Sequence, residues 1–348
     1  MKVDQLVRSN IKNLKPFSSA RSEFSGEAEV FLDANESPYN NGINRYPDPY
    51  QLELKEMIAS RQPCTADNII LGNGSDEIID LLVRTFCVPG KDRIRYISPS
   101  FGMYEVTADI NDVGKMQVPL TAQFDLDVEL CVKEQTEEDK ILFLCSPNNP
   151  TGNLLTRSLM IEVIASWKGI VVVDEAYINF SDETSMLALI ENHPKLVILQ
   201  TFSKAFGAAG LRLGIGYASP EIINYLNKIK PPYNVNSLTQ ERAMSLLENE
   251  VKISTQLSKT KKERTRLEDE LKNIAGIEHV FPSDANFLLV RCQNYKMLYN
   301  HLSKKGIILR DRSKLPNCER CLRMTVGRAE ENDLLIQEIK KFYSNHNS

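Results

Sequence analysis

The sequence predicts an α/β protein with a large domain built on a mainly parallel sheet, a smaller α+β C-terminal domain and an N-terminal arm. Three observations predict this. Between about Asp67 and Tyr217, short β-branched runs alternate with longer amphipathic stretches, as in a parallel sheet covered by helices on both faces. Beyond Pro231 and Pro232, the pattern becomes one long charged helix followed by short strands. The length of 348 residues suits about two domains.

The large domain is expected over residues 36–236. Its strands read as nearly continuous apolar runs, which is typical of strands buried on both faces. We expect these strands at residues 68–71, 93–98, 140–145, 170–175 and 195–201. Amphipathic helices are expected between them at residues 75–87 and 156–167.

The small domain is expected over residues 237–348. It begins with a charged helical pattern at 239–274, which we interpret as one helix. Shorter strands are expected after it, at residues 287–292 and 321–326. Residues 1–35 are expected to form an arm that packs on this small domain.

Composition and charge exclude several classes of protein. Lys and Arg number 42 against 46 Asp and Glu, so the net charge is −4 and no basic excess is present to hold nucleic acid. The first seventeen residues alternate apolar and charged positions and lack the apolar run of a signal peptide or membrane span. We therefore expect a cytoplasmic protein that binds neither nucleic acid nor membrane.

The cysteines predict neither disulfides nor a metal site. Seven cysteines are scattered along the chain, and this odd number fits free buried thiols better than a disulfide framework. Cys318 and Cys321 form a CxxC pair, but no second pair or histidine pair stands near them to complete a zinc site.

Three polar clusters directly follow three predicted strands, at their carboxyl ends. They lie at residues 146–152 (SPNNPTG), 174–177 (DEAY) and 201–204 (TFSK). In open α/β sheets, ligands bind in the crevice beyond these strand ends. All three clusters are therefore expected to face one site.

A fourth polar segment, residues 72–77 (GNGSDE), joins a predicted strand to a predicted helix. The amides and dipole of the helix N-terminus would favour an anion there. As a dinucleotide fingerprint the segment fails, because Glu77 stands where the third glycine should be. A plain turn with an acidic helix start is the alternative.

Lys204 is the first candidate for chemistry, because a lysine at the end of a buried strand is partly desolvated, which lowers its pKa and frees the amine. Taken alone, such a lysine is more often a surface residue. Its neighbours change that balance: Thr201 and Ser203 offer hydroxyl donors, and Arg212 offers a bidentate anion fork. Together with a helix N-terminus they would form a phosphate-binding cup.

Asp174 ends a run of apolar residues, where an ionised carboxylate is costly unless it meets a cation. A ring nitrogen that becomes protonated would be such a partner. Asn149 and Tyr177 could then hydrogen-bond a phenolic oxygen across that ring. Each residue has an ordinary structural explanation, but these do not explain why all of them follow strand ends.

With these residues in view, the chain resembles the fold-type I pyridoxal-phosphate aminotransferases, and within them the histidinol-phosphate aminotransferase family. The resemblance covers nearly the whole chain. The motifs stand in the family's order: NLKPFSSAR, LDANESP, NRYPDP, FCVPGKD, FGMYEV, CSPNNPTG, VVDEAYINF, TFSKAFGAAGLRLG, GIILRDR and CLRMTVG. The resemblance implies a fold-type I large domain.

The resemblance also implies roles in binding pyridoxal 5'-phosphate. Lys204 would hold the cofactor covalently, Asp174 would pair with its ring nitrogen, and Asn149 and Tyr177 would bind its phenolic oxygen. A further aromatic residue would stack on the ring, and it is Phe101, where the family usually has tyrosine. The phosphate would be bound by Ser75, Asp76, Thr201, Ser203, Arg212 and, from a neighbouring subunit, Tyr46. This last contact implies a homodimer with active sites at the subunit interface.

For the substrates, the resemblance implies binding by Asn35, Tyr46, Asn149, Arg310 and Arg323. The two arginines would read the anions of both substrates, because glutamate carries carboxylates and histidinol phosphate carries a phosphate. Phe17 also stands where the family usually has tyrosine, so a hydroxyl near the substrate phosphate is missing.

The expected activity is exchange of an amino group between L-histidinol phosphate and 2-oxoglutarate in histidine biosynthesis. Two alternatives share the fold: a threonine-phosphate decarboxylase and an aromatic amino-acid aminotransferase. The cofactor-binding residues do not separate them, because they leave the choice of reaction to substrate contacts. A regulatory module fused to a DNA-binding head is a further alternative, but the segment before LDANESP is too short for such a head.

Overall fold

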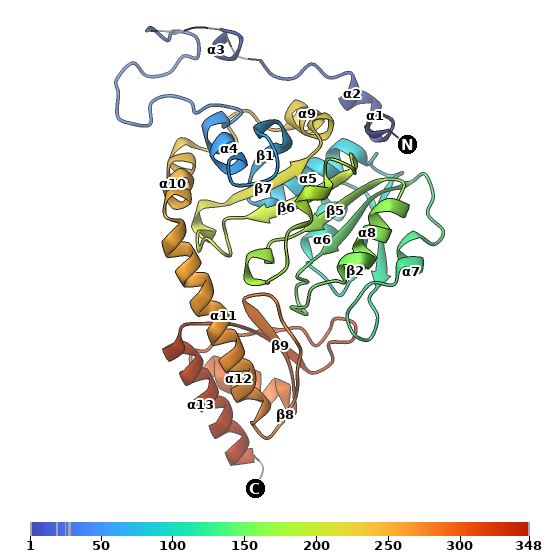
Figure 1. Ribbon diagram of the computed structural model, residues 1–348, viewed down its shortest axis with the longest axis vertical. Helices are drawn as coiled ribbons and strands as arrows, with labels where there is room; N and C mark the ends of the chain where they lie inside the picture. The colour runs from blue at the N-terminus through green and yellow to red at the C-terminus, as the bar shows by residue number, and fades with distance from the viewer. Residues whose placement is uncertain (1, 19, 25, 27–28, 347–348) are drawn as a thin grey trace.

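The computed structural model describes residues 2–18, 20–24, 26 and 29–346 (Figure 1). Ser19, within the NLKPFSSAR motif, lies outside them. Two sheets organise the described chain: one of seven strands in the upper part of Figure 1 and one of four strands in the lower part. The predicted α/β class is confirmed.

The seven-stranded sheet has the order β1-β7-β6-β5-β4-β2-β3. Its strands are β1 (Ile69–Asn73), β2 (Arg93–Ser98), β3 (Gly114–Pro119), β4 (Asp139–Cys145), β5 (Ile170–Asp174), β6 (Leu196–Thr201) and β7 (Leu213–Ala218). The pairs among β2 to β6 are parallel, and β7 runs antiparallel to both β1 and β6. The sheet is therefore mainly parallel, as predicted, while β3 and β7 were not among the predicted strands.

Helices cover both faces of this sheet, because alternate strand residues enter two separate apolar cores. Ile70 and Val172 face the core under α5, α6 and α9. Leu71 and Val173 face the core under α4 and α8. The helices are α4 (Leu52–Ala59), α5 (Ser75–Phe86), α6 (Met103–Ile110), α7 (Val128–Val132), α8 (Arg157–Ser166) and α9 (Pro220–Ile229), with 3-10 turns at Ala66–Asn68, Ile178–Phe180, Met186–Leu189 and Ala209–Leu211.

The four-stranded sheet has the order β10-β11-β9-β8 and is antiparallel throughout. Its strands are β8 (Ile277–Val280), β9 (Phe287–Cys292), β10 (Arg310–Asp311) and β11 (Cys321–Thr325). One face packs on α11 (Glu250–Lys272), α12 (Tyr295–Lys304) and α13 (Ala329–His346) around a third core. The two strands predicted here, at 287–292 and 321–326, are confirmed.

The single helix predicted over 239–274 is wrong, because the chain forms α10 (Ser237–Glu248) and then α11. Asn249 separates them with φ −101° and ψ 40°, outside the helical region, and its side-chain amide donates to the carbonyl of Ser245 at 2.7 Å. Asparagine competes in this way for backbone hydrogen bonds and so favours helix ends. Ala243 of α10 belongs to a core of the large sheet, whereas α11 covers the small sheet.

The arm begins with α1 (Val3–Leu6) and α2 (Ser9–Lys12), and α3 (Ala20–Glu23) follows. We expected the arm to pack on the small domain, but α1 and α2 pack on α9 and α5 beside the large sheet. The hydroxyl of Tyr225 donates to Asp4 at 2.7 Å, and the backbone amide of Asp4 donates to Glu221 at 3.1 Å. The apolar side of α1 and α2 explains this placement, since Val3, Leu6 and Ile11 are buried there.

All seven cysteines are free, as predicted, and six of them are buried. Among the described residues, no cluster of histidine, cysteine and carboxylate side chains could hold a metal ion. No helix in the described part of the chain is long and apolar enough to cross a membrane.

Candidate active site

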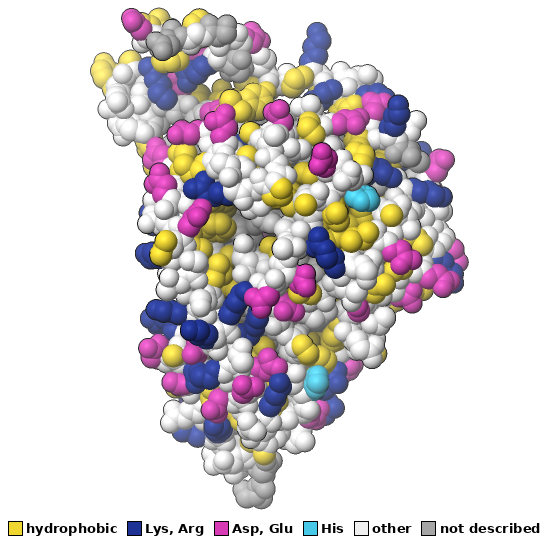
Figure 2. Space-filling view, viewed as in Figure 1, with side chains coloured by type: hydrophobic (Ala, Val, Ile, Leu, Met, Phe, Trp, Pro, Cys, Tyr) yellow, Lys and Arg dark blue, Asp and Glu magenta, His cyan; other side chains and the backbone are white. Residues whose placement is uncertain are grey.

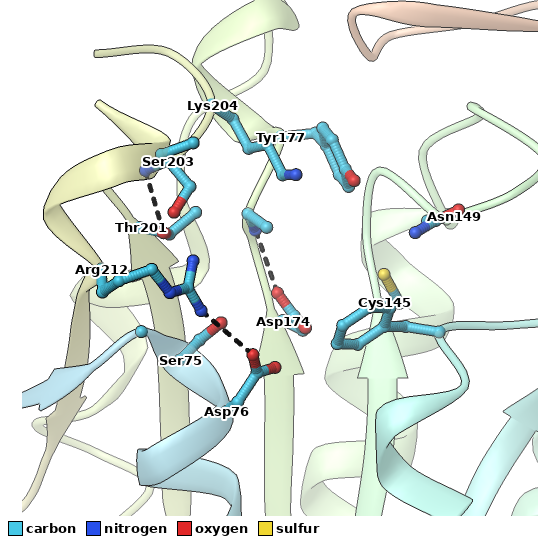
Figure 3. A pocket seen from close by; sticks show the side chains of 14 residues that line it. Ser75, Asp76, Cys145, Asn149, Asp174, Tyr177, Thr201, Ser203, Lys204 and Arg212 are labelled. Carbon is cyan, nitrogen blue, oxygen red and sulfur yellow. Dashed lines mark hydrogen bonds and ion pairs between the residues drawn. The ribbon is translucent and has the colours of Figure 1, made fainter. Parts of the chain in front are cut away.

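A pocket opens at the carboxyl ends of β4, β5 and β6, beside the junction of β1 and α5 (Figure 3). The structure brings ten of the predicted site residues together in its lining: Ser75, Asp76, Phe101, Asn149, Asp174, Tyr177, Thr201, Ser203, Lys204 and Arg212. The remaining lining residues are Gly74, Cys145, Ala176 and Ala209. The strand-end clusters therefore face one site because parallel strands end at the same edge of the sheet.

One side of the pocket offers donors for an anion. Ser75 is the first residue of α5, a helix of 12 residues, so its amide lies at the positive end of the helix dipole. Across from it, the guanidinium of Arg212 donates to Asp76 at 3.3 Å, and the Ser203 amide donates to the Thr201 hydroxyl at 3.1 Å. Figure 3 shows Ser75, Thr201, Ser203 and Arg212 gathered on this side.

Glycine keeps this side narrow. Gly74, with φ +80°, precedes α5, and a Cβ there would lie 2.7 Å from the Arg212 guanidinium. Gly214 of β7 is even closer, because a Cβ on it would lie 2.2 Å from the backbone nitrogen of Ser75. The helix N-terminus can therefore reach Arg212 and the end of β6 only because these positions carry no side chain.

Asp174 lies at the centre of the site and is 3% exposed. It accepts hydrogen bonds from the hydroxyl of Tyr104 at 2.7 Å and from the backbone amide of Ala176 at 3.1 Å. Burial raises its pKa, and these hydrogen bonds only partly oppose that rise. No ion pair joins Asp174 to a cation within the described part of the chain. A cationic group in the pocket would complete this carboxylate.

Lys204 follows β6 and extends its amine toward Tyr177 and the space above Asp174 (Figure 3). The residue is exposed at the mouth of the pocket, and its amine lies 5.7 Å from the centre of the Tyr177 ring. Burial of the amine lowers its pKa, and the positive charge of Arg323 lowers it further. The neutral amine is thus more available here than in water.

Asn149 and Tyr177 form the side of the pocket opposite the anion donors, and both are buried. Burial raises the pKa of Tyr177, so its phenol stays protonated at neutral pH and can donate a hydrogen bond. The side-chain oxygen of Asn149 accepts a hydrogen bond from the guanidinium of Arg323. Arg323 lies on β11, so this contact brings the small sheet to the edge of the site.

Four predicted site residues stand outside the pocket lining: Asn35, Tyr46, Arg310 and Arg323. Asn35 is the last residue of the arm, and Tyr46 lies in the segment that follows it, where it is exposed and stacks on Tyr233 with ring centres 4.5 Å apart. Phe17, also on the arm, meets the same ring edge-on at 6.3 Å. Arg310 is exposed on β10 directly opposite Arg323.

Two residues of the site were not predicted. Tyr104 of α6 is fully buried, and its hydroxyl holds Asp174. Cys145 ends β4 and lines the pocket, and burial raises the pKa of its thiol. Cys145 could have been predicted from the sequence, because it ends an apolar run directly before SPNNPTG. Tyr104 gives no such signal, because the pairing of α6 with β5 is not visible in local sequence.

A family model for aminotransferase class I and II matches residues 23–339 of this chain. The crystal structure of the histidinol-phosphate aminotransferase from Clostridium acetobutylicum matches with a TM-score of 0.80 at 28% identity, over 87% of this chain and 92% of that chain. One from Sinorhizobium meliloti, solved in complex with pyridoxal-5'-phosphate, matches with a TM-score of 0.79 at 23% identity over 87% and 83%. The fold is therefore that of fold-type I aminotransferases.

Relatives by sequence are more similar. A histidinol-phosphate aminotransferase from Parabacteroides distasonis is 52% identical over 335 residues, which cover 96% of this chain and 97% of the relative. The match therefore spans nearly the whole of both chains. The chain therefore belongs to the aminotransferase class I and II family and, within it, to the histidinol-phosphate aminotransferases.

Proposed function

We propose that this enzyme uses pyridoxal 5'-phosphate to exchange an amino group between L-histidinol phosphate and 2-oxoglutarate, giving imidazole acetol phosphate and L-glutamate. The observation that carries the proposal is the single pocket that holds a lysine amine, a buried carboxylate and a cup of anion donors. The name of the Parabacteroides distasonis relative supports this substrate over threonine phosphate and aromatic amino acids. Its place is histidine biosynthesis in the cytoplasm.

The pocket residues fit this cofactor. The uncompensated Asp174 carboxylate suits a ring nitrogen that carries a proton, and the cup at Ser75, Thr201 and Arg212 suits a phosphate. Phe101 offers an aromatic face beside them. When bound, the cofactor supplies an electron sink for the bond that breaks at the substrate α-carbon.

The protein's own residues would then handle protons and orientation. Lys204, with its lowered pKa, would give up its covalent hold on the cofactor, accept the proton from the substrate α-carbon and deliver it to the C4′ atom of the cofactor. Asp174 would keep its partner nitrogen protonated, and Tyr104 and Ala176 would fix the carboxylate in place. Tyr177 and Asn149 would bind the phenolic oxygen from the opposite side.

Arg323 and Arg310 would bind the substrate anions. Arg323 stands beside Asn149 and would take the α-carboxylate of glutamate or the phosphate of histidinol phosphate. Arg310, opposite it on β10, would take the distal carboxylate of glutamate. Asn149 would thus serve both cofactor and substrate.

A homodimer would complete the site, with Tyr46 reaching the partner's phosphate cup and Asn35 reaching substrate. The exposed apolar side chains of the arm and of the segment after it, up to residue 46, support this, because such a surface is costly in water. They are Leu14, Phe17, Phe24, Val30, Phe31, Leu32, Tyr39, Ile43 and Tyr46. Figure 2 shows hydrophobic side chains on the arm and on the adjoining part of the body. Glu36 orders this segment by binding Arg21, Arg45 and the Tyr46 amide, at 2.8, 2.8 and 2.6 Å.

The substrate is tested by comparing kcat/KM for three amino donors with the purified holoenzyme: histidinol phosphate, phenylalanine and threonine phosphate. Histidinol phosphate should exceed the others by at least about 100-fold, because a site built to pair polar groups rejects ligands that leave them unpaired. Release of carbon dioxide from threonine phosphate at a comparable rate would instead support the decarboxylase.

The role of Lys204 is tested with Lys204→Ala. Turnover should fall by at least about 1,000-fold, because the change removes both the covalent attachment and the general base. Lys259→Ala, at an exposed lysine of α11, is the matched control and should retain full activity. Substantial activity in Lys204→Ala would refute the assignment.

A further inference from the structure

Three arginines stand side by side on the small sheet. In the antiparallel pair of β10 and β11, Arg310 lies directly opposite Arg323. The backbone amide of Arg312 donates to the carbonyl of Cys321 at 3.0 Å, which continues the pairing by one residue. Residues two apart on an extended strand point to the same side, so Arg312 is expected on the side of Arg310 and Arg323.

This row borders the proposed active site. Arg323 donates to Asn149 in the pocket lining and lies 5.2 Å from the ring centre of Phe287. Phe287 meets Tyr177 edge-on at 5.1 Å. Arg312 is close enough to Tyr177 for the two groups to influence each other's pKa. Arg312 therefore lies near Tyr177, on the side of the pocket that Arg323 borders.

No anion of the described chain balances these arginines. None of the three forms an ion pair with a carboxylate among the described residues, whereas Arg320 on the same loop pairs with Glu278. The Nε of Arg312 is buried without a hydrogen-bond partner. Burial, together with the charges of Arg323 and Arg310, lowers the pKa of Arg312 to about 10. A buried guanidinium without a carboxylate partner is costly, so an anion bound beside it would stabilise the group.

We propose that Arg312 is a third substrate-binding arginine, which selects the phosphate of the amino donor over a carboxylate. This inference deepens the proposed function and rests on it. The row on β10 and β11 would hold a phosphate monoester with Arg312 and Arg323, while glutamate would use Arg323 and Arg310. Arg312 is not among the residues that line the pocket, so it is not one of the residues proposed to bind the cofactor.

Charge and hydrogen-bond capacity favour phosphate for this extra arginine. A phosphate monoester carries a charge of about −1.5 to −2 and three acceptor oxygens, whereas a carboxylate carries one charge and two oxygens. A second guanidinium therefore gains more from a phosphate than from a carboxylate.

The test compares both half-reactions in Arg312→Gln. For histidinol phosphate, kcat/KM should fall by at least about 30-fold, mostly through KM, because a charge-assisted hydrogen bond in a desolvated site is lost. For glutamate, kcat/KM should change by less than about threefold, since its carboxylates keep Arg310 and Arg323. Arg320→Gln, on the same loop but paired with Glu278, is the matched control and should match the unmodified enzyme for both substrates.

A second measurement does not depend on which amine is the substrate. Inorganic phosphate and glutarate are used as competitive inhibitors of the holoenzyme, whose cofactor already fills the other phosphate site. Arg312→Gln should weaken inhibition by phosphate by at least about 10-fold and leave inhibition by glutarate unchanged. Arg312→Lys keeps the positive charge but loses the bidentate guanidinium, so it should weaken inhibition by phosphate by a smaller factor. This variant replaces Arg312→Gln in the test if Arg312→Gln does not fold.

Two results would overturn the proposal. Equal losses for histidinol phosphate and glutamate would mean that Arg312 supports the whole anion site and does not select phosphate. No loss for either substrate, with unchanged phosphate inhibition, would mean that Arg312 does not bind substrate. Failure of the unmodified enzyme to use histidinol phosphate would instead refute the proposed function. The inhibition measurements would then still test whether Arg312 binds phosphate.

Discussion

Asp174 is a single residue that links the stability of the protein to the proposed binding of the cofactor. Its carboxylate is buried with a raised pKa and has no cationic partner in the described chain. A group with a raised pKa in the folded state contributes stability below its unfolded pKa of about 4, and this contribution is lost as the pH rises through the folded pKa. The cofactor-free protein should therefore be destabilised by this residue at neutral pH.

Asp174→Asn should reverse this effect in the cofactor-free protein. At pH 8 the variant should be more stable than the unmodified chain by about 1 kcal/mol or more, and at pH 4 the two should be nearly equal, because asparagine does not titrate. Cofactor binding should stabilise the variant less than the unmodified chain, because the ring nitrogen of the cofactor would have no carboxylate to pair with. Urea unfolding across this pH range measures both effects. Parallel stability curves for the two proteins would contradict the account.

At the residue scale, the sequence was enough to predict residues that the structure brings together in one pocket, but not the contacts that hold them there. Strand ends pointed to three of these candidates, because ligands bind beyond the carboxyl ends of parallel strands. They are Asp174 at the end of β5, and Lys204 and Arg212 in the segment that follows β6. The hydrogen bond from Tyr104 to Asp174 spans 70 positions and could not be identified, because no local pattern records which helix residue packs on which strand. Arg312 was equally hidden, since its significance lies in what surrounds it.

At the scale of elements, the close approach of β7 and α5 builds the anion side of the pocket. A Cβ on Gly214 would lie 2.2 Å from the Ser75 nitrogen and 2.4 Å from the Gly74 carbonyl carbon, so the backbone must move. Gly214→Ala should therefore destabilise the protein by about 2 kcal/mol or more and weaken cofactor binding by at least about 10-fold.

Cofactor titration followed by absorbance, together with thermal unfolding, measures the effect of Gly214→Ala. Gly102→Ala is the matched control, because a Cβ there meets no atom within 4 Å and the backbone lies in the right-handed region. Unaltered cofactor affinity in Gly214→Ala would show that the junction of β7 and α5 does not set the geometry of the cup.

Element prediction from the sequence worked where periodicity was strong and failed where a polar residue changed the local geometry. Strands β2, β4, β5 and β6 were predicted because their apolar runs are continuous. Strand β3 was missed because most of its residues are exposed at the sheet edge. The break at Asn249 was missed because one residue carries little weight in a helical pattern of this length.

At the scale of the whole molecule, the arm and the segment after it carry the surface proposed to meet a partner subunit. Several apolar side chains between residues 14 and 46 are exposed, and Tyr46 stacks on Tyr233. The predicted packing of the arm on the small domain failed for α1 and α2, because their apolar faces match α9 and α5. The domain boundaries after residues 35 and 236 stay predictions.

Dimerisation should control cofactor affinity if Tyr46 completes the partner's cup. Sedimentation at decreasing protein concentration should show cofactor release in step with dissociation to monomers. Tyr46→Ala should weaken cofactor binding by about 10-fold or more, whereas Tyr39→Ala, at an exposed tyrosine of the same segment, should not. A monomer that retains its cofactor fully would contradict the shared site.

The central claim is that the pocket moves an amino group from histidinol phosphate to 2-oxoglutarate. The most direct measurement follows that nitrogen atom: purified holoenzyme is incubated with histidinol phosphate labelled with nitrogen-15 in its amino group and with unlabelled 2-oxoglutarate. We predict that mass spectrometry finds the label in glutamate at a rate equal to the loss of histidinol phosphate, and that Lys204→Ala abolishes it. Consumption of histidinol phosphate without labelled glutamate, or no consumption at all, would contradict the account.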